Sequence, residues 1–195
     1  SIADVGGEVR LLDPFVVAAA LRGLPAGEHK GQRGHLGIVG GSPGTTGAAL
    51  LAGVAALRAG AGLVTVASPD PALPTVLLAA RPELMTAPLV ADPRQLLPRA
   101  GALVVGPGLT CAAGQAVLPQ LWGEDARPAL WDASALDRVP VGGGMPGGPR
   151  VITPHPGEAA RLLQRVPAER FRMLEHGVSV PLPRSVASLG ADAVA

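Results

Sequence analysis

The chain has 195 residues, including 27 Gly, 21 Pro and one Cys. So much Gly and Pro without a period is typical of disordered chains, but 48% of the residues are hydrophobic and only 16% are charged, which is enough apolar surface for a folded core. A formal charge of +1 without a basic run argues against nucleic-acid and membrane-surface partners. One Cys excludes a disulfide framework and a multi-cysteine zinc site.

The sequence shows no targeting or membrane segment. Its first residues lack the charged region and apolar stretch of a signal peptide. The most apolar window, residues 47–67, contains Arg58 and several glycines, and is too interrupted for a membrane span. We therefore expect a soluble, cytoplasmic protein.

From residue 35 onward, short apolar runs alternate with helix-like segments. Strands that are apolar on both faces and separated by helices indicate parallel pairing with covered faces. Such βα units predict an open, doubly wound α/β sheet. The predicted strands are 35–40, 63–67, 102–106, 129–132 and 150–153, and the predicted helices are 48–59, 71–80, 111–122 and 157–165.

The two ends and one internal segment fit this pattern less well. Residues 1–27 are interpreted as a linker from a preceding domain with one short helix at 14–21, and residues 28–195 as the main domain. The Gly-rich segment 142–148 predicts a flexible surface connection between two strands. A further strand is predicted to begin at 191–195.

Ligands of open parallel sheets bind beyond the carboxyl ends of the strands, and the first candidate there is the glycine-rich loop, residues 40–47. Glycines allow close backbone approach, and the following helix N-terminus offers N–H groups to an anion. The alternative is plain turn chemistry, with Ser42, Thr45 or Thr46 as an N-cap. The spacing matches neither the Gly-x-Gly-x-x-Gly pattern nor a P-loop.

The second candidate is the Gly-Pro-Gly turn, residues 106–110, between a strand and a helix. Its alternative reading is an ordinary turn with Thr110 as the helix cap. Cys111 follows in the predicted first helical turn, where the helix dipole lowers a thiol pKa. No partner His is fixed nearby, so a small core residue is favoured over a nucleophile.

Two further candidates follow the last two predicted strands. Asp132 stands at a strand end, where a carboxylate binds a hydroxyl group or Mg²⁺, or else caps the next turn. His155 lies between Pro154 and Pro156, which stiffen its presentation, and Glu158 complements the helix dipole; the alternative is an exposed loop histidine. The other three histidines are interpreted as structural or solvated.

An ordered set of motifs lies between residues 28 and 165. The set comprises His29-Lys30-Gly31, residues 40–48, residues 55–64, residues 80–85, Gly106-Pro107-Gly108-Leu109, residues 132–136 and residues 153–163. Any one motif is weak evidence, but together they resemble the ADP/ATP-dependent NAD(P)H-hydrate dehydratase family of the ribokinase-like superfamily.

The resemblance implies a three-layer α/β/α sandwich with a mostly parallel sheet, and repair of hydrated NADH or NADPH. In the family a nucleotide, ADP or ATP with Mg²⁺, phosphorylates the hydroxyl of the damaged ring, and phosphate then leaves. Carried over by motif, Ala48, Gly108 and His155 line the hydrated-dinucleotide site, and Asp132 lies in the same crevice. Ser134 stands where the family has a second aspartate. We also expect a homo-oligomer.

Two family motifs are absent from these 195 residues: the Gly-Thr-Gly-Asp segment that carries the catalytic base, and the Lys-Gly-x-x-Thr nucleotide segment. No catalytic residue is therefore assigned, and we expect the chain to be an internal piece of a longer epimerase/dehydratase. Two alternatives stay open: a vitamin-precursor kinase of the same superfamily, and a dinucleotide-binding module without catalysis.

Overall fold

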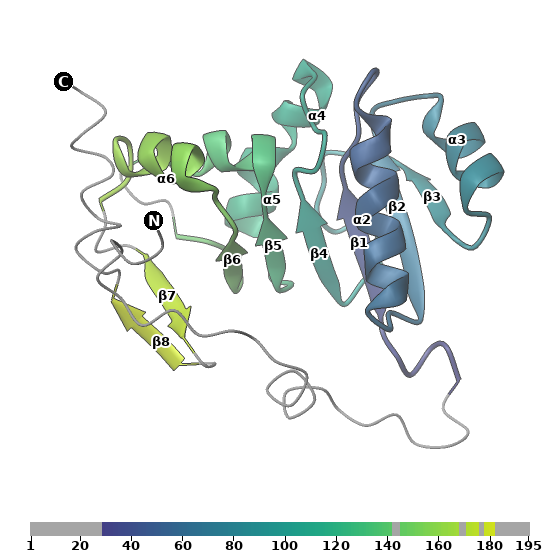
Figure 1. The fold of residues 1–195 in the computed structure, drawn as a ribbon, viewed down its shortest axis with the longest axis horizontal. Helices are drawn as coiled ribbons and strands as arrows, with labels where there is room; N and C mark the ends of the chain where they lie inside the picture. Colours follow the sequence, from purple (N-terminus) through teal and green to yellow (C-terminus); the bar gives the residue numbers. More distant parts are fainter. Residues whose placement is uncertain (1–28, 142–144, 168–170, 176–177, 182–195) are drawn as a thin grey trace, which may run out of the picture.

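Six parallel strands form one sheet in the computed structural model, which describes residues 29–141, 145–167, 171–175 and 178–181 (Figure 1). The strands are β1 (His35–Val39), β2 (Leu63–Ser68), β3 (Met85–Pro88), β4 (Ala102–Val105), β5 (Ala129–Trp131) and β6 (Arg150–Ile152). Their order is β3-β2-β1-β4-β5-β6, and every neighbouring pair is parallel. The predicted parallel α/β sheet is confirmed.

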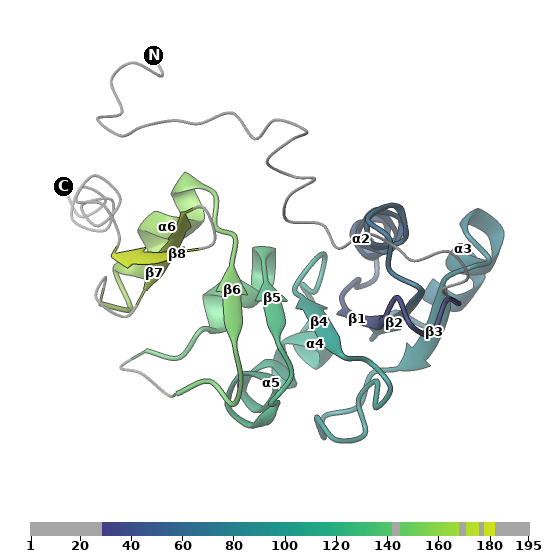
Figure 2. The same ribbon diagram turned by 90° about the horizontal axis from the view of Figure 1, so that it is seen from below.

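Helices cover both faces of this sheet. Helices α2 (Thr46–Arg58) and α3 (Leu73–Ala80) pack on one face and α5 (Leu118–Glu124) on the other (Figure 2). Successive strand residues point to opposite faces, so Ile38 joins the core beneath α2 while Val39 joins the core beneath α5. The three-layer prediction is confirmed. None of the described helices is both long and apolar enough to cross a membrane.

The predicted helix 111–122 is wrong in one respect, because the structure divides it into two helices. Helix α4 (Ala112–Ala116) ends before Val117, and α5 then begins with Pro119 in its first turn. A proline has no N–H to donate, and its ring collides with the carbonyl of the residue four positions earlier. Pro119 therefore starts a second helix and cannot continue the first.

Several elements were not predicted. Strand β3 is a short, mostly exposed edge strand that ends at Pro88, and a 3-10 helix, η2 (Ala133–Arg138), follows β5 directly. The strands β7 (Arg172–Glu175) and β8 (Val178–Pro181) form an antiparallel pair.

Helix α6 (Pro156–Leu163) agrees with the predicted helix 157–165. The predicted linker 1–27, helix 14–21, strand 191–195 and residues 142–144 of the Gly-rich connection lie outside the described residues.

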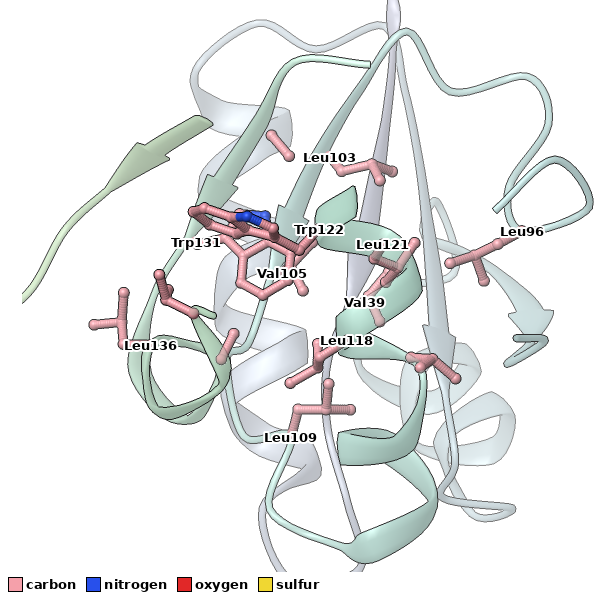
Figure 3. Close-up of a cluster of buried hydrophobic side chains, with 14 of the residues drawn as sticks. Val39, Leu96, Leu103, Val105, Leu109, Leu118, Leu121, Trp122, Trp131 and Leu136 are labelled. Carbon is pink, nitrogen blue, oxygen red and sulfur yellow. The ribbon is translucent and has the colours of Figure 1, made fainter. Parts of the chain in front are cut away.

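The larger apolar core lies between the sheet and α5 (Figure 3). Trp131 of β5 is completely buried there, and its ring meets that of Trp122 edge-to-face, with 5.0 Å between the centroids. Leu118 and Leu121 of α5 complete the contact with the sheet. The two tryptophans thus fix α5 beneath β5 and the loops that follow it.

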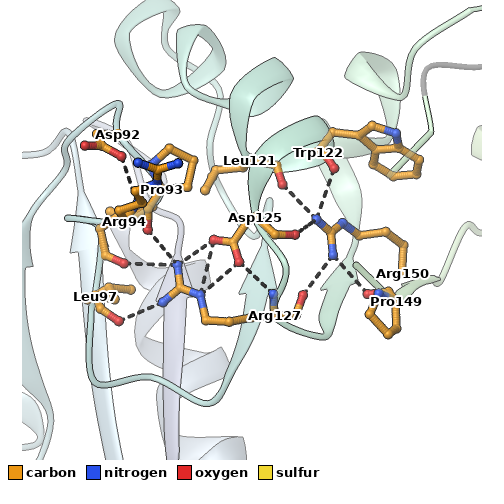
Figure 4. A network of polar contacts seen from close by, with 11 residues as sticks. Asp92, Pro93, Arg94, Leu97, Leu121, Trp122, Asp125, Arg127, Pro149 and Arg150 are labelled. Carbon is orange, nitrogen blue, oxygen red and sulfur yellow. Dashed lines mark hydrogen bonds and ion pairs between the residues drawn. The ribbon is translucent and has the colours of Figure 1, made fainter. Parts of the chain in front are cut away.

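A network of buried charges holds the amino ends of β5 and β6 (Figure 4). The Arg127 guanidinium bonds the Asp125 carboxylate and the carbonyl oxygens of Pro93, Leu96 and Leu97. Burial alone raises the pKa of Asp125, but the hydrogen bonds and charge of Arg127 outweigh it, and the pKa lies below its usual value. Arg150 donates to the main-chain oxygens of Leu121, Trp122, Asp125 and Arg127.

Candidate functional site

The candidate site is the carboxyl edge, which we define as the edge of the sheet where β1, β4, β5 and β6 end. These four strands are consecutive neighbours. The chain leaves β1 for β2 and β3 on one side and returns through β4 on the other side. The loops after β1 and β4 therefore diverge, and such a switch point is where open α/β sheets bind ligands. These two loops are the glycine-rich loop and the Gly-Pro-Gly turn.

Ala48 and Gly108, which the resemblance assigned to one site, lie against each other. Gly108 has a φ of +67°, in the left-handed region that favours glycine. A Cβ added there would lie 2.5 Å from the carbonyl oxygen of Thr45 and 3.0 Å from the Cβ of Ala48. The first turn of α2 and the Gly-Pro-Gly turn thus meet at a contact that only glycine permits.

Thr45, one of the three N-cap candidates, is the N-cap residue of α2, but the hydroxyl groups of the glycine-rich loop bond other partners. No side chain caps the helix among the described residues. The Thr45 hydroxyl donates to the carbonyl of Gly108 at 2.7 Å, the Thr46 hydroxyl donates to Asp70, and Ser42 bonds the turn after β4. The first N–H groups of α2 therefore have no side-chain acceptor.

Asp132 follows β5 and lies next to the Gly-Pro-Gly turn. It is the N-cap residue of η2, with an extended backbone, as the cap alternative places it, but its side chain makes no cap hydrogen bond. Gly106 has a φ of +119°, and a Cβ there would overlap the carbonyl oxygen of Asp132. The Ser134 hydroxyl donates to the Gly106 carbonyl at 3.0 Å. Asp132 is half-buried, with no hydrogen bond to its carboxylate from the described residues.

His155 is the N-cap residue of α6. Its Nδ1 accepts the N–H groups of Gly157 and Glu158 at 3.1 and 3.4 Å, and the Glu158 carboxylate accepts the N–H of His155 at 3.0 Å. This reciprocal pair is a capping box. Because Nδ1 accepts, these bonds place the ring proton of the neutral imidazole on Nε2. Nε2 lies 3.5 Å from Glu158 Oε1, and the side chain is 65% exposed, so a ligand can reach the Nε2–H group beside the Glu158 carboxylate.

Strand β6 and helix α6 carry His155 to the same edge as Asp132. The N–H of Thr153 donates to the carbonyl of Trp131 at 3.2 Å, which aligns the ends of β6 and β5. Helix α6 packs on η2, where Arg161 Nε lies 3.6 Å from Asp137 Oδ1. The structure therefore brings Ala48, Gly108 and Asp132 into one continuous row and places His155 on the neighbouring strand end.

A sequence model of the NAD(P)H-hydrate dehydratase family matches residues 36–179. The chain belongs to this family. The bifunctional NAD(P)H-hydrate repair enzyme Nnr of Escherichia coli (strain K12) is 47% identical over 144 residues, which are 69% of this chain and 26% of that protein. The ADP-dependent (S)-NAD(P)H-hydrate dehydratase of Xanthomonas campestris pv. campestris is 42% identical over 164 residues, which are 75% of this chain and 55% of that protein.

Solved structures agree with this family membership. The ADP/ATP-dependent NAD(P)H-hydrate dehydratase from Bacillus subtilis, co-crystallized with ATP/Mg²⁺, superposes with a TM-score of 0.64 at 29% identity, covering 80% of this chain and 59% of that one. A ribokinase-like superfamily protein from Enterococcus faecalis V583 has a TM-score of 0.70 at 22% identity, which shows the shared fold. The chain spans about a quarter to three fifths of the length of these relatives.

Asp70, which follows β2, lies beside the carboxyl edge and was not among the site residues predicted from the sequence. It is 7% exposed. Its Oδ1 accepts the N–H of Ala72 at 2.9 Å, and the hydroxyl of Thr46 bonds its other oxygen. The Thr46 hydrogen bond and then the Ala72 N–H lower the pKa of Asp70. The Ser-Pro-Asp-Pro segment after a predicted strand signals such a turn, but the pairing with Thr46 is visible only in three dimensions.

Cys111 and His35 have local roles. Cys111, and not Thr110 as the ordinary-turn alternative had it, is the N-cap residue of α4. A hydrogen bond with Ser42 and then the N–H of Gly114 lower the pKa of the Cys111 thiol. His35 bonds the Thr65 hydroxyl at 2.8 Å, which confirms a structural role. No group of three or more His, Cys, Asp or Glu side chains suited to a metal ion occurs in the described residues.

Replacing Gly108 with alanine is expected to impair the site more than the fold. The new Cβ would press on the Thr45 carbonyl and require a left-handed backbone, which costs about 1 kcal/mol or more. The turn would move away from Ala48, and binding of hydrated NADPH, measured by calorimetry, should weaken about tenfold or more. Gly44→Ala is the matched control, because Gly44 also has a positive φ but no atom near its Cβ position. Equal effects of both substitutions would contradict a role for the Gly108 contact.

Proposed function

We propose that this chain binds hydrated NADH or NADPH at the carboxyl edge and takes part in the nucleotide-dependent dehydration that restores the normal cofactor. One observation carries the proposal: the four positions matched to the family's dinucleotide site, Ala48, Gly108, Asp132 and His155, come from the ends of four adjacent strands. The names of the relatives as NAD(P)H-hydrate dehydratases and repair enzymes support the same substrate class.

The chemistry of such a reaction explains why a nucleotide is needed. Hydroxide leaves a carbon atom poorly, whereas phosphate leaves well. The nucleotide supplies a phosphoryl group to the ring hydroxyl, whose proton is released. The carbon–oxygen bond of the resulting ester then breaks, phosphate departs with the bonding pair, and loss of a ring proton forms the double bond of NADH or NADPH.

The residues of the chain suit the binding part of this task. The main-chain N–H groups of Thr46 and Gly47, which begin α2, have no side-chain acceptor among the described residues and suit an anionic group such as the pyrophosphate, whereas that of Ala48 donates to the Thr45 carbonyl. The Nε2–H of His155 is a second donor for a phosphate or carboxamide oxygen. Gly108 lets the main chain approach the ligand closely, and the Asp132 carboxylate, which accepts no hydrogen bond from the described residues, can accept a hydroxyl hydrogen.

ADP or ATP with Mg²⁺ forms the second part of the proposal. Relatives are named for dependence on ADP and on ATP, and the Bacillus subtilis enzyme was crystallised with ATP/Mg²⁺. Mg²⁺ is usually held by one or two carboxylates together with substrate phosphates. Asp132, a half-buried carboxylate that follows β5 at the carboxyl edge, suits this role. The catalytic base is not assigned.

The decisive assay supplies hydrated NADPH with ADP or with ATP and follows the absorbance of the restored dihydronicotinamide together with phosphate release. Recovery that requires the nucleotide supports the proposal. Failure to recover the cofactor, with phosphorylation of a hydroxymethyl-pyrimidine or thiazole alcohol, would favour the kinase alternative. Binding of the hydrate without turnover would favour a dinucleotide-binding module.

The proposal also includes a location in the cytoplasm and assembly of the chain into a homo-oligomer. Exposed apolar side chains of α2 and α3 support the assembly. Leu51 is 71% exposed and Leu78 is 70% exposed. We expect light scattering to give a mass that is a multiple of the 19.5 kDa chain, and Leu51→Lys to shift it toward one chain without lowering the melting temperature. A wild-type mass of one chain at all concentrations would refute the oligomer. Cell fractionation tests the location.

A further inference from the structure

Ser42 joins the two loops that meet at the switch point of the sheet. The residue is 1% exposed. Its Oγ accepts the main-chain N–H of Thr110 at 3.0 Å and that of Cys111 at 3.2 Å, although these residues are 68 and 69 positions away in the chain. One hydroxyl of the glycine-rich loop thus holds two N–H groups of the loop after β4.

Two more hydrogen bonds join the same loops. The Thr45 hydroxyl donates to the Gly108 carbonyl at 2.7 Å, and the N–H of Gly41 donates to the Pro107 carbonyl at 2.8 Å. Gly108, with its left-handed backbone, therefore lies between anchored residues on both sides. The conformation that places it against Ala48 is imposed by the glycine-rich loop and not by the turn alone.

We propose that Ser42 is a positioning residue for the dinucleotide site, whose hydroxyl holds the main chain around Gly108 in the conformation that receives the ligand. This proposal rests on the function proposed above. A small hydroxyl is suited to the role because its oxygen accepts two N–H groups within a fully buried space. Alanine would remove the Ser42 acceptor of the Cys111 N–H and would leave the Thr110 N–H with only the Gly108 carbonyl, to which it also donates at 3.1 Å. The turn would then relax to satisfy the Cys111 N–H elsewhere.

Cys111 provides an independent readout of this anchor. Both N–H groups use lone pairs of Ser42 Oγ, so the hydroxyl hydrogen is left to donate to Cys111 Sγ. This hydrogen bond is the largest cause of the lowered thiol pKa. Cys111 is the only cysteine in the chain, so an alkylating reagent reports on this junction alone.

The test compares Ser42→Ala, Thr45→Val and Ser68→Ala in the same chain. The first two remove separate anchors of the turn. The third removes a hydroxyl at the same edge of the sheet that bonds Gly41 and Asp70 instead. Calorimetry with hydrated NADPH should show affinity about tenfold weaker for Ser42→Ala and a smaller loss for Thr45→Val, while Ser68→Ala binds like the wild type. Thr45→Val keeps the test valid if Ser42→Ala fails to fold.

The rate of Cys111 alkylation against pH gives the second measurement. Ser42→Ala should raise the thiol pKa, and Ser68→Ala should leave it unchanged. Wild-type affinity in both turn variants, or an equal loss in Ser68→Ala, would overturn the positioning role. If the wild-type chain binds no hydrate, the proposed function fails and the positioning role fails with it; a raised thiol pKa in Ser42→Ala would then show that the anchor is purely structural.

Discussion

Replacing His155 with asparagine should weaken the binding of hydrated NADPH by about 10- to 100-fold while the stability of the fold changes little. We expect His155 to have two separable functions, because Nδ1 caps α6 whereas Nε2, which lies 3.5 Å from Glu158 Oε1 on a largely exposed side chain, is left to donate to a ligand. The amide oxygen of asparagine occupies nearly the position of Nδ1, and asparagine is among the best N-cap residues. The variant therefore keeps the helix cap and loses the Nε2–H donor. Calorimetry should show weaker binding of hydrated NADPH, and the melting temperature should be unchanged.

His155→Gln is the reciprocal variant. Its amide nitrogen reaches nearly the position of Nε2 and donates there, but its oxygen is too distant to cap the helix. We expect a loss of about 1 kcal/mol in the free energy of unfolding with affinity for the hydrate within a few-fold of the wild type. If the asparagine variant bound the hydrate normally and the glutamine variant did not, His155 would act only as a cap, and its place in the ligand site would be refuted.

Local patterns in the sequence were sufficient to predict most of the sheet. Five of the six strands appear where apolar runs predicted them, because strands covered on both faces carry continuous apolar residues. Strand β3 escaped prediction because it is a four-residue edge strand with a mostly exposed sequence. The break between α4 and α5 was predictable, since Pro119 cannot continue a helix that already includes residue 115.

The candidate site was predictable at the level of loops but not of contacts. Strand ends in a parallel sheet meet at one edge, so Asp132 and His155 were expected there. Glu158 was expected only to complement the helix dipole, and its capping box with His155 was not predicted, because the sequence signature of that motif begins with Ser or Thr. The Ser42 and Asp70 contacts were not predictable from local sequence. Each joins segments far apart in the chain and depends on the strand order at the switch point, which no local pattern encodes.

Replacing Arg127 with methionine should lower the free energy of unfolding by about 3–5 kcal/mol, the largest stability effect we expect in this chain. The Arg127 side chain is 19% exposed and that of Asp125 only 3%. The substitution leaves the Asp125 carboxylate buried without its partner, and three main-chain carbonyls lose a donor. Urea unfolding at neutral pH measures the loss. Arg94→Met makes the same change at an exposed neighbouring site and should stay within about 0.5 kcal/mol of the wild type.

The pH dependence of this loss in the free energy of unfolding distinguishes its two causes: the Asp125 carboxylate without its partner, and the main-chain carbonyls without their donor. In the wild type, Arg127 keeps the pKa of Asp125 below its unfolded value, so this contribution to stability is complete at neutral pH and is lost as the pH falls through the folded pKa. Without the guanidinium, burial is opposed only by the main-chain N–H of residue 127 and the charge of Arg150, so the pKa of Asp125 is higher than in the wild type. Protonation of Asp125 then removes the buried charge of the variant at a higher pH than in the wild type. The difference in the free energy of unfolding between wild type and Arg127→Met should therefore become smaller from pH 7 to about pH 4. If that difference were the same at every pH, the whole loss of stability would be due to the hydrogen bonds that Arg127 donates to the carbonyl oxygens of Pro93, Leu96 and Leu97.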